Sequence, residues 1–258
     1  MASNGYIYRN FMTRIYLTLL CLAAMPFLGL SQERITPHKN IVDKKWIKNQ
    51  DYQMVWTMLR DTSSIKIGIV NTKIDVLANQ ILVITEVKMN ANPSPWIDST
   101  TVNRADLSPV YHASYNAQRD MSIHFGKEIT GFYQDKVANK TTAIAQKVPA
   151  GYFDSNFYPM LINWLPLKTG YKADLDIYDY NPKGKMGVIK AHILSVSEGI
   201  YRTQKLGDRK VWIVEASDEI GTIADSRSIY QIDQLNRQLY KQKILVGNRT
   251  MEMTLVEN

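Results

Sequence analysis

Apolar and polar residues alternate along most of the chain, as in β-strands whose two faces meet different surroundings. In residues 52–59 every second position is apolar or aromatic, and the polar residues 60–64 separate this stretch from the β-rich run 65–70. Two such runs with a short polar connection predict a hairpin.

Further runs of this kind recur about every ten residues, a spacing typical of sandwiches and barrels. They lie at residues 73–77, 81–89, 110–115, 121–125, 129–133, 142–148, 171–177, 188–196, 201–204, 211–216, 228–233, 239–246 and 251–256. No Gly/Pro/Ser-rich linker interrupts them. The pattern predicts an all-β fold in one domain, residues 46–258, after an N-terminal arm, residues 32–45.

One segment breaks the alternation and predicts a short helix at about residues 156–165. Its apolar residues follow the spacing of one helix face: Phe157, Met160, Leu161, Trp164 and Leu165. Asp154-Ser155-Asn156 supplies capping side chains, Pro159 suits the first turn and Pro166 stops the helix. We expect this helix to plug or flank the sheet. Farther along, Asn181-Pro182-Lys183-Gly184 predicts a type I turn.

The N-terminal residues predict a secretory signal peptide, residues 1–31. Arg14 precedes a short apolar run, and the small residues Gly29 and Ser31 mark a cut before Gln32. The run is shorter than the roughly 20 residues that span a membrane, so no transmembrane anchor is expected after cleavage. Export then places the protein in the periplasm or at the outer membrane. Either Met1 or Met12 is the start.

Composition narrows the chemistry further. The single cysteine, Cys21, lies in the leader, so the mature chain is expected to have no disulfide, thiol nucleophile or Cys-ligated zinc. The net charge of +7 comes from scattered basic residues, with Lys44, Lys45 and Lys48 as the densest group. Nucleic acid is not an expected partner, whereas weak attraction to anionic lipid is.

No catalytic, metal or cofactor site is predicted. Three aspartates, Asp174, Asp176 and Asp179, lack the Gly bend and distal Glu of a calcium loop and suit the solvent face of a strand. Four histidines, His38, His112, His124 and His192, lack metal-binding spacing, although His112 and His124 on adjacent strands are able to converge.

Two short patterns imitate serine β-lactamases. Ser63-Ser64-Ile65-Lys66 matches S-x-x-K and Lys168-Thr169-Gly170 matches K-T-G, but Ser63 lies in a polar turn and Lys66 in a strand. The chain is therefore expected not to be an enzyme.

The 15 Tyr, 5 Trp and 11 Met residues are either core or the lining of a cavity for acyl chains. Composition alone favours core.

Several segments resemble the bacterial periplasmic family called domain of unknown function 3108 (DUF3108). These segments are Asp98-Ser99, Leu107-Ser108-Pro109, Tyr152–Asn156, the Leu165-Pro166-Leu167 turn ending at Gly170, and Tyr230–Asp233 with Arg237. The resemblance covers residues 52–256. It implies a strongly curved antiparallel half-barrel, similar to the lipoprotein carriers LolA and LolB, and an envelope location. The family brings no assigned reaction or functional residues.

Two hypotheses of function follow. In the first, the half-barrel is a binding module for a lipid or other apolar ligand, contacted by Phe157, Met160, Leu161, Trp164 and Leu165. In the second, the protein is an assembly partner that pairs its exposed strand edges with another envelope protein.

Overall fold

The computed structural model describes residues 33–60, 63–221 and 226–257. The predicted signal peptide lies outside the described residues. Glu33–Asn258 forms one compact unit. Among the helices in the described part of the chain, none has the length and apolar character needed to cross a membrane.

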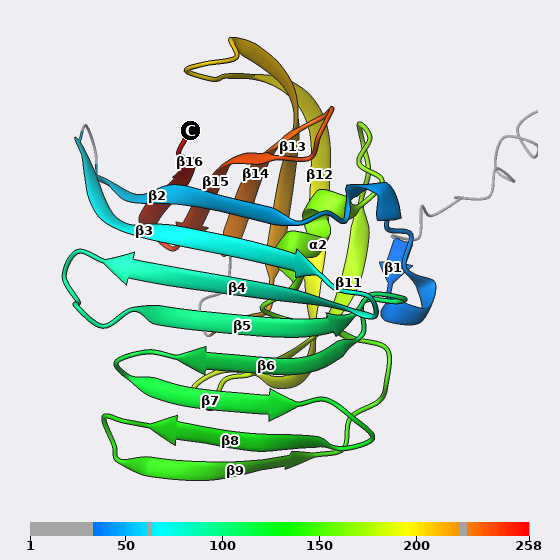
Figure 1. The fold of residues 1–258 in the computed structure, drawn as a ribbon, viewed down its shortest axis with the longest axis vertical. Helices are drawn as coiled ribbons and strands as arrows, with labels where there is room; N and C mark the ends of the chain where they lie inside the picture. The colour runs from blue at the N-terminus through cyan, green and yellow to red at the C-terminus, as the bar shows by residue number, and fades with distance from the viewer. Residues whose placement is uncertain (1–32, 61–62, 222–225, 258) are drawn as a thin grey trace, which may run out of the picture. The chain divides into compact units, whose positions relative to one another are not determined.

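The first part of the unit is an antiparallel meander of eight strands (Figure 1). They are β2 (Gln50–Arg60), β3 (Ser63–Val76), β4 (Gln80–Met89), β5 (Trp96–Asn103), β6 (Pro109–Tyr115), β7 (Arg119–His124), β8 (Ile129–Asp135) and β9 (Lys140–Gln146). The runs predicted at 65–70 and 73–77 form one long strand, β3.

A second antiparallel meander follows the helix. Its strands are β11 (Ala173–Tyr180), β12 (Met186–Arg202), β13 (Asp208–Asp218), β14 (Arg227–Asp233), β15 (Leu239–Val246) and β16 (Arg249–Leu255). The last strand, β16, pairs with β2 and so joins both meanders into one sheet. Two short strands, β1 (Glu33–Ile35) and β10 (Phe153–Asp154), pair with β11 in parallel. The edges of the sheet are therefore β1 and β9.

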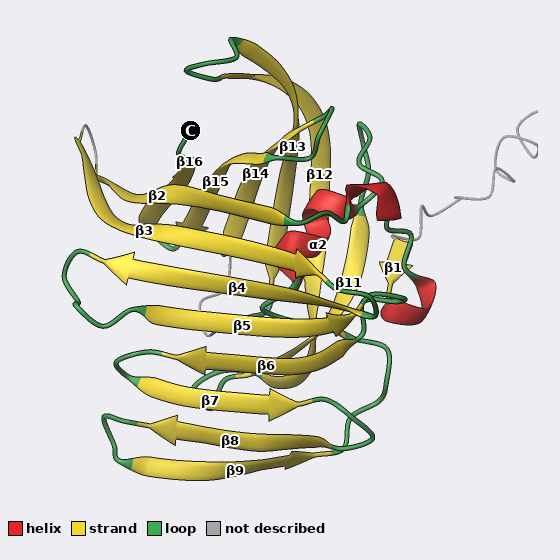
Figure 2. Cartoon of the chain, viewed as in Figure 1, coloured by secondary structure: helices red, strands yellow, loops and turns green. Residues whose placement is uncertain are grey.

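The sheet is curved and unclosed, and α2 (Tyr158–Trp164), the one α-helix among the described residues, lies on its concave side (Figure 2). Tyr52 of β2 donates a hydrogen bond to Met160 Sδ (3.7 Å), and Tyr158 donates one to Asp218 at the end of β13. The helix thus contacts both meanders. The predicted all-β class with one short helix is confirmed.

Apolar packing around α2 forms most of the core. Phe157, Leu161 and Leu165 have no exposed surface, and Trp164 is 1% exposed. The Phe157 and Trp164 rings meet edge to face, with centroids 5.6 Å apart. The apolar residues of α2 lie on one helix face, and this face packs into the core between the two meanders. Such packing explains why so short a helix is stable here.

The predicted arm contributes to the fold. Besides β1 it contains the 3₁₀ turns η1 (Pro37–Lys39) and η2 (Lys44–Trp46). Ile35 is fully buried, and the Asp43 amide donates to the carbonyl of Trp164 at the end of α2 (3.1 Å).

The helix begins differently from the prediction. Its N-cap is Phe157, which makes no side-chain cap, while Asp154, Ser155 and Asn156 bond to other strands. The predicted capping role was wrong, because buried strand residues compete for these side chains.

Candidate functional site

A hollow of about 450 Å³ opens where four strand connections meet: β4–β5, β6–β7, β8–β9 and β11–β12. Its apolar lining comes mainly from Met89, Trp96, Tyr133 and Val137, its cationic lining from Arg119 and Lys183, and its acidic lining from Asp135. The other lining residues are mostly neutral and polar. A volume of this size falls within the roughly 300–1,000 Å³ of small-molecule sites. Apolar and cationic groups together suit an amphiphilic molecule.

The predicted type I turn forms one rim of the hollow. The Gly184 amide donates to the Asn181 carbonyl (2.9 Å), and the Lys183 amide donates to the Asn181 side chain (3.0 Å). Lys183 Nζ lies 3.8 Å from Asp135 Oδ2 on β8. The turn, which forms the β11–β12 connection, is therefore linked to β8.

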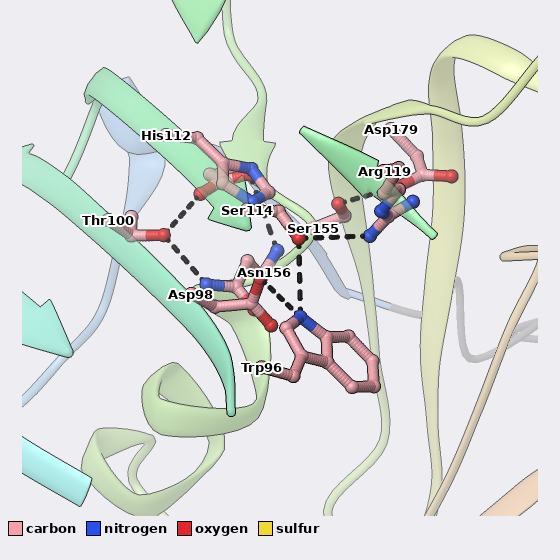
Figure 3. Close-up of polar contacts among 10 residues, drawn as sticks. Trp96, Asp98, Thr100, His112, Ser114, Arg119, Ser155, Asn156 and Asp179 are labelled. Carbon is pink, nitrogen blue, oxygen red and sulfur yellow. Dashed lines mark hydrogen bonds and ion pairs between the residues drawn. The ribbon is translucent and has the colours of Figure 1, made fainter. Parts of the chain in front are cut away.

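Behind the hollow, β5 and β6 direct polar side chains to the concave face. Trp96, Asp98 and Thr100 occupy alternate positions of β5, and the register places Thr100 opposite His112 and Asp98 opposite Ser114. Figure 3 shows these side chains converging. All except Trp96 are buried, so each needs a partner within the protein.

Asp154 is the centre of this network and has no exposed surface. Its Oδ2 accepts a hydrogen bond from Thr100 Oγ1 (2.8 Å), and its Oδ1 lies 3.0 Å from His112 Nδ1. Asn156 Nδ2 donates to Thr100 Oγ1 (2.9 Å). Because Asp154 belongs to β10, which pairs with β11, these bonds connect β5 and β6 to the second meander.

Ser114 holds two of the side chains that line the hollow. Its Oγ accepts hydrogen bonds from Trp96 Nε1 and from Arg119 Nη2, both at 3.2 Å. Trp96 Nε1 also donates to Asp98 Oδ1 (2.8 Å). Arg119 Nε is buried and has no hydrogen-bond partner. The guanidinium is thus held in place with unused hydrogen-bonding capacity.

Asp179 of β11 lies at the same end of the network. Its Oδ1 accepts from Ser155 Oγ (2.8 Å), whereas its buried Oδ2 has no partner. Burial raises the pKa of Asp179, and the neighbouring Asp154 adds to the rise. Arg119 and His112 act in the opposite direction on that pKa.

The pKa of His112 is also shifted by the network. Burial alone lowers the pKa of His112, but the carboxylates of Asp154 and Asp98 outweigh it and raise the pKa above its ordinary value. In the described residues no hydroxyl bonds to the second ring nitrogen of His112. The His112–Asp154 pair therefore lacks the nucleophile contact of a hydrolytic triad.

The sequence pattern does not predict this site, although several of its residues belong to other predicted features. His112 and His124 do not converge, because His112 pairs with Ile123 and the two histidines lie on opposite faces of the sheet. Asp176 is not on a solvent face: it is 2% exposed and ion-paired with Lys190 (2.5 Å) and Arg34. Within the described ranges, no group of three potential metal ligands is found.

The predicted ligand-contact residues lie elsewhere, on and beside α2. Four of them are buried in the apolar core, and Met160 packs partly buried against it. The hollow is not lined by these residues. Their contact with a ligand stays a prediction.

Comparison with known proteins identifies a family and one related fold. Residues 51–254 match the family model described as "Protein of unknown function (DUF3108)". The sequence matches no curated protein. A crystal structure of a β-barrel-like protein of the DUF1849 domain from Brucella abortus is similar, with a TM-score of 0.52 and 11% identity. The match covers 81% of this chain and 96% of that one. At this identity the likeness concerns the fold alone.

Proposed function

The chain belongs to the DUF3108 family, and we propose that it is a non-enzymatic binding module for a lipid or other apolar ligand. The observation that carries this proposal is the hollow of about 450 Å³, where Met89, Trp96, Tyr133 and Val137 provide apolar surface at an open end of the curved sheet. Apolar lining with a few placed polar groups is the usual character of a small-molecule site.

The polar network supports the same function. It ties the walls of the hollow to both meanders, so the pocket is preformed rather than assembled by the ligand. Preorganisation of this kind lowers the entropy that binding must overcome. Periplasmic location, reached through cleavage before Gln32, belongs to the proposal.

A native mass spectrum of the protein purified from its own envelope tests this function. We expect the folded chain to carry a small apolar molecule that organic extraction removes and that rebinds on readdition. Repeated preparations without such a mass, together with no uptake of added fatty acid, would contradict the proposal.

A second function is supported by the edge of the sheet. Strand β9 ends the sheet and leaves one side without a β partner, and its residues 140–143 are exposed. Such an edge suits strand addition by an envelope protein. In the same mass spectrum, a stoichiometric protein partner in place of a small apolar mass favours this assembly role.

A further inference from the structure

We propose that Arg119 binds the oxyanion head group, a carboxylate or a phosphate, of an amphiphilic ligand in the hollow. This inference rests on the proposed binding function and names the chemical class of its ligand. It begins from the charge of Arg119, which lines the hollow at the start of β7.

Arg119 has no ion-pair partner in the part of the chain that the structure describes. Its Nη2 donates a hydrogen bond to a neutral hydroxyl, Ser114 Oγ, and its Nε is buried without a partner. Two other arginines on strands differ: Arg209 pairs with Asp233 and Arg227 with Glu215, both at 2.9 Å. A half-buried guanidinium without a counter-ion attracts an external anion strongly.

The neighbouring carboxylates leave this charge available. Asp135 accepts from the Val137 and Ala138 amides and lies near Lys183. Asp120 pairs with Lys136 (2.6 Å). Asp98 accepts from Trp96, and Asp154 is occupied by Thr100 and His112.

Asp135 lies opposite Arg119 in the β7–β8 register, and Asp179 is a second internal competitor. Asp179 interacts electrostatically with Arg119 without forming an ion pair, and its Oδ2 is free of hydrogen bonds. Figure 3 shows both side chains at the same end of the network. Burial makes the ionised form of Asp179 unfavourable, so Asp179 neutralises Arg119 poorly.

The surroundings of Arg119 select an amphiphile rather than a free inorganic anion. Ser114 holds the guanidinium beside the indole of Trp96, and Tyr133 and Val137 extend the apolar surface. Guanidinium groups bind carboxylate and phosphate through paired, charge-assisted hydrogen bonds. A head group on Arg119 thus places its attached chain against the apolar lining.

The experiment compares three ligands with one chain length and different heads, dodecanoate, dodecyl phosphate and dodecanol, and adds inorganic phosphate as an anion without a chain. Binding is measured by calorimetry on the full chain at about pH 8, where carboxylic acids are ionised. The variant is Arg119→Gln. The control is Arg104→Gln, which removes a cation from a separate hollow at the opposite ends of the strands. Thermal unfolding checks that both variants fold.

We expect the unmodified protein to bind at least one of the two anions about tenfold or more tightly than dodecanol, because charge-assisted hydrogen bonds are stronger than hydrogen bonds between neutral groups. Arg119→Gln should remove this preference and leave dodecanol binding unchanged, and Arg104→Gln should preserve it. Which anion binds more tightly identifies the head group.

The two ways of failing are distinguishable. Equal binding of all three ligands, unaffected by Arg119→Gln, overturns the role of Arg119 and leaves the binding function standing. No binding of any ligand overturns the binding function itself. Binding of inorganic phosphate as tightly as dodecyl phosphate overturns the amphiphile and leaves only an anion site.

Discussion

Two parts of the segment 153–165 face the same concave surface and differ in character. The later part, helix α2, presents an apolar face that neighbouring side chains cover, so that Trp164 is only 1% exposed. The earlier part, residues 154–156, presents polar groups that bond to β5, β6 and β11 beside a hollow. Stability is therefore expected to depend most on the helix, and ligand recognition most on the polar end.

The largest expected effect concerns the apolar face of helix α2. Trp164→Ala should lower the free energy of unfolding by about 3–5 kcal/mol, because removing a fully buried aromatic side chain leaves a cavity. Urea denaturation followed by far-UV circular dichroism measures this loss. A loss of only about 1–2 kcal/mol, together with altered fatty-acid uptake, would indicate instead that Trp164 roofs a ligand cavity.

A smaller loss of unfolding free energy is expected when the polar network around residues 154–156 is changed. Thr100→Val removes the hydroxyl that donates to Asp154 and accepts from Asn156. Loss of these hydrogen bonds, one of them to the buried Asp154 Oδ2, should lower the free energy of unfolding by about 1–3 kcal/mol. Thr101→Val, at the next position of β5 and on its other face, is the matched control and should change stability by less than about 0.5 kcal/mol. Equal effects of the two substitutions would show that the network adds no stability.

The polar network should also make the stability of the fold depend on pH, through His112. The pKa of His112 is raised in the folded protein, so its protonated form stabilises the fold fully below the unfolded value of about 6.5. This stabilisation is lost as the pH rises through the folded pKa. Denaturation across this range should show the decline in the unmodified protein and a flatter profile in His112→Gln. A folded pKa below 6.5, measured by NMR, would reverse the sign.

The smallest expected effect concerns Asp179, a competitor of Arg119. Because burial raises the pKa of Asp179, its ionised form destabilises the fold at neutral pH, and lowering the pH toward the unfolded value reduces this destabilisation. Asp179→Asn should therefore raise stability slightly, by less than about 1 kcal/mol, and tighten binding of an anionic amphiphile. A clear loss of stability in this variant would mean that Asp179 and Arg119 stabilise each other.

The contrast between the two parts also explains what the sequence predicts. Apolar spacing at Phe157, Leu161 and Trp164 reveals α2, and alternation in residues 52–59 reveals β2. Strand β5 has no such signal, because its buried positions include Asp98 and Thr100 in place of apolar residues. Strand β5, which supplies Trp96, Asp98 and Thr100 to the site, is therefore missed by periodicity.

Asp154 illustrates the other source of error. Its neighbours make it a good local helix cap, and only the tertiary fold brings Thr100 and His112 to it across 54 and 42 residues of sequence. Arg119 has no local signal at all, since its missing counter-ion is a property of the folded surroundings. A polar run directly before an apolar helix, together with an earlier strand that has polar residues at its buried positions, is the sequence feature that points to such a network.

Uptake of a fluorescent fatty acid by two matched variants tests the central claim most directly. Ala117 and Ala105 are exposed residues in strand connections, Ala117 at the proposed hollow and Ala105 at the separate hollow of about 540 Å³. Phenylalanine at either position should occupy the adjoining hollow and change the free energy of unfolding by less than about 0.5 kcal/mol. We expect Ala117→Phe to abolish uptake and Ala105→Phe to preserve it. Undiminished uptake by Ala117→Phe would contradict the assignment of the ligand to this hollow.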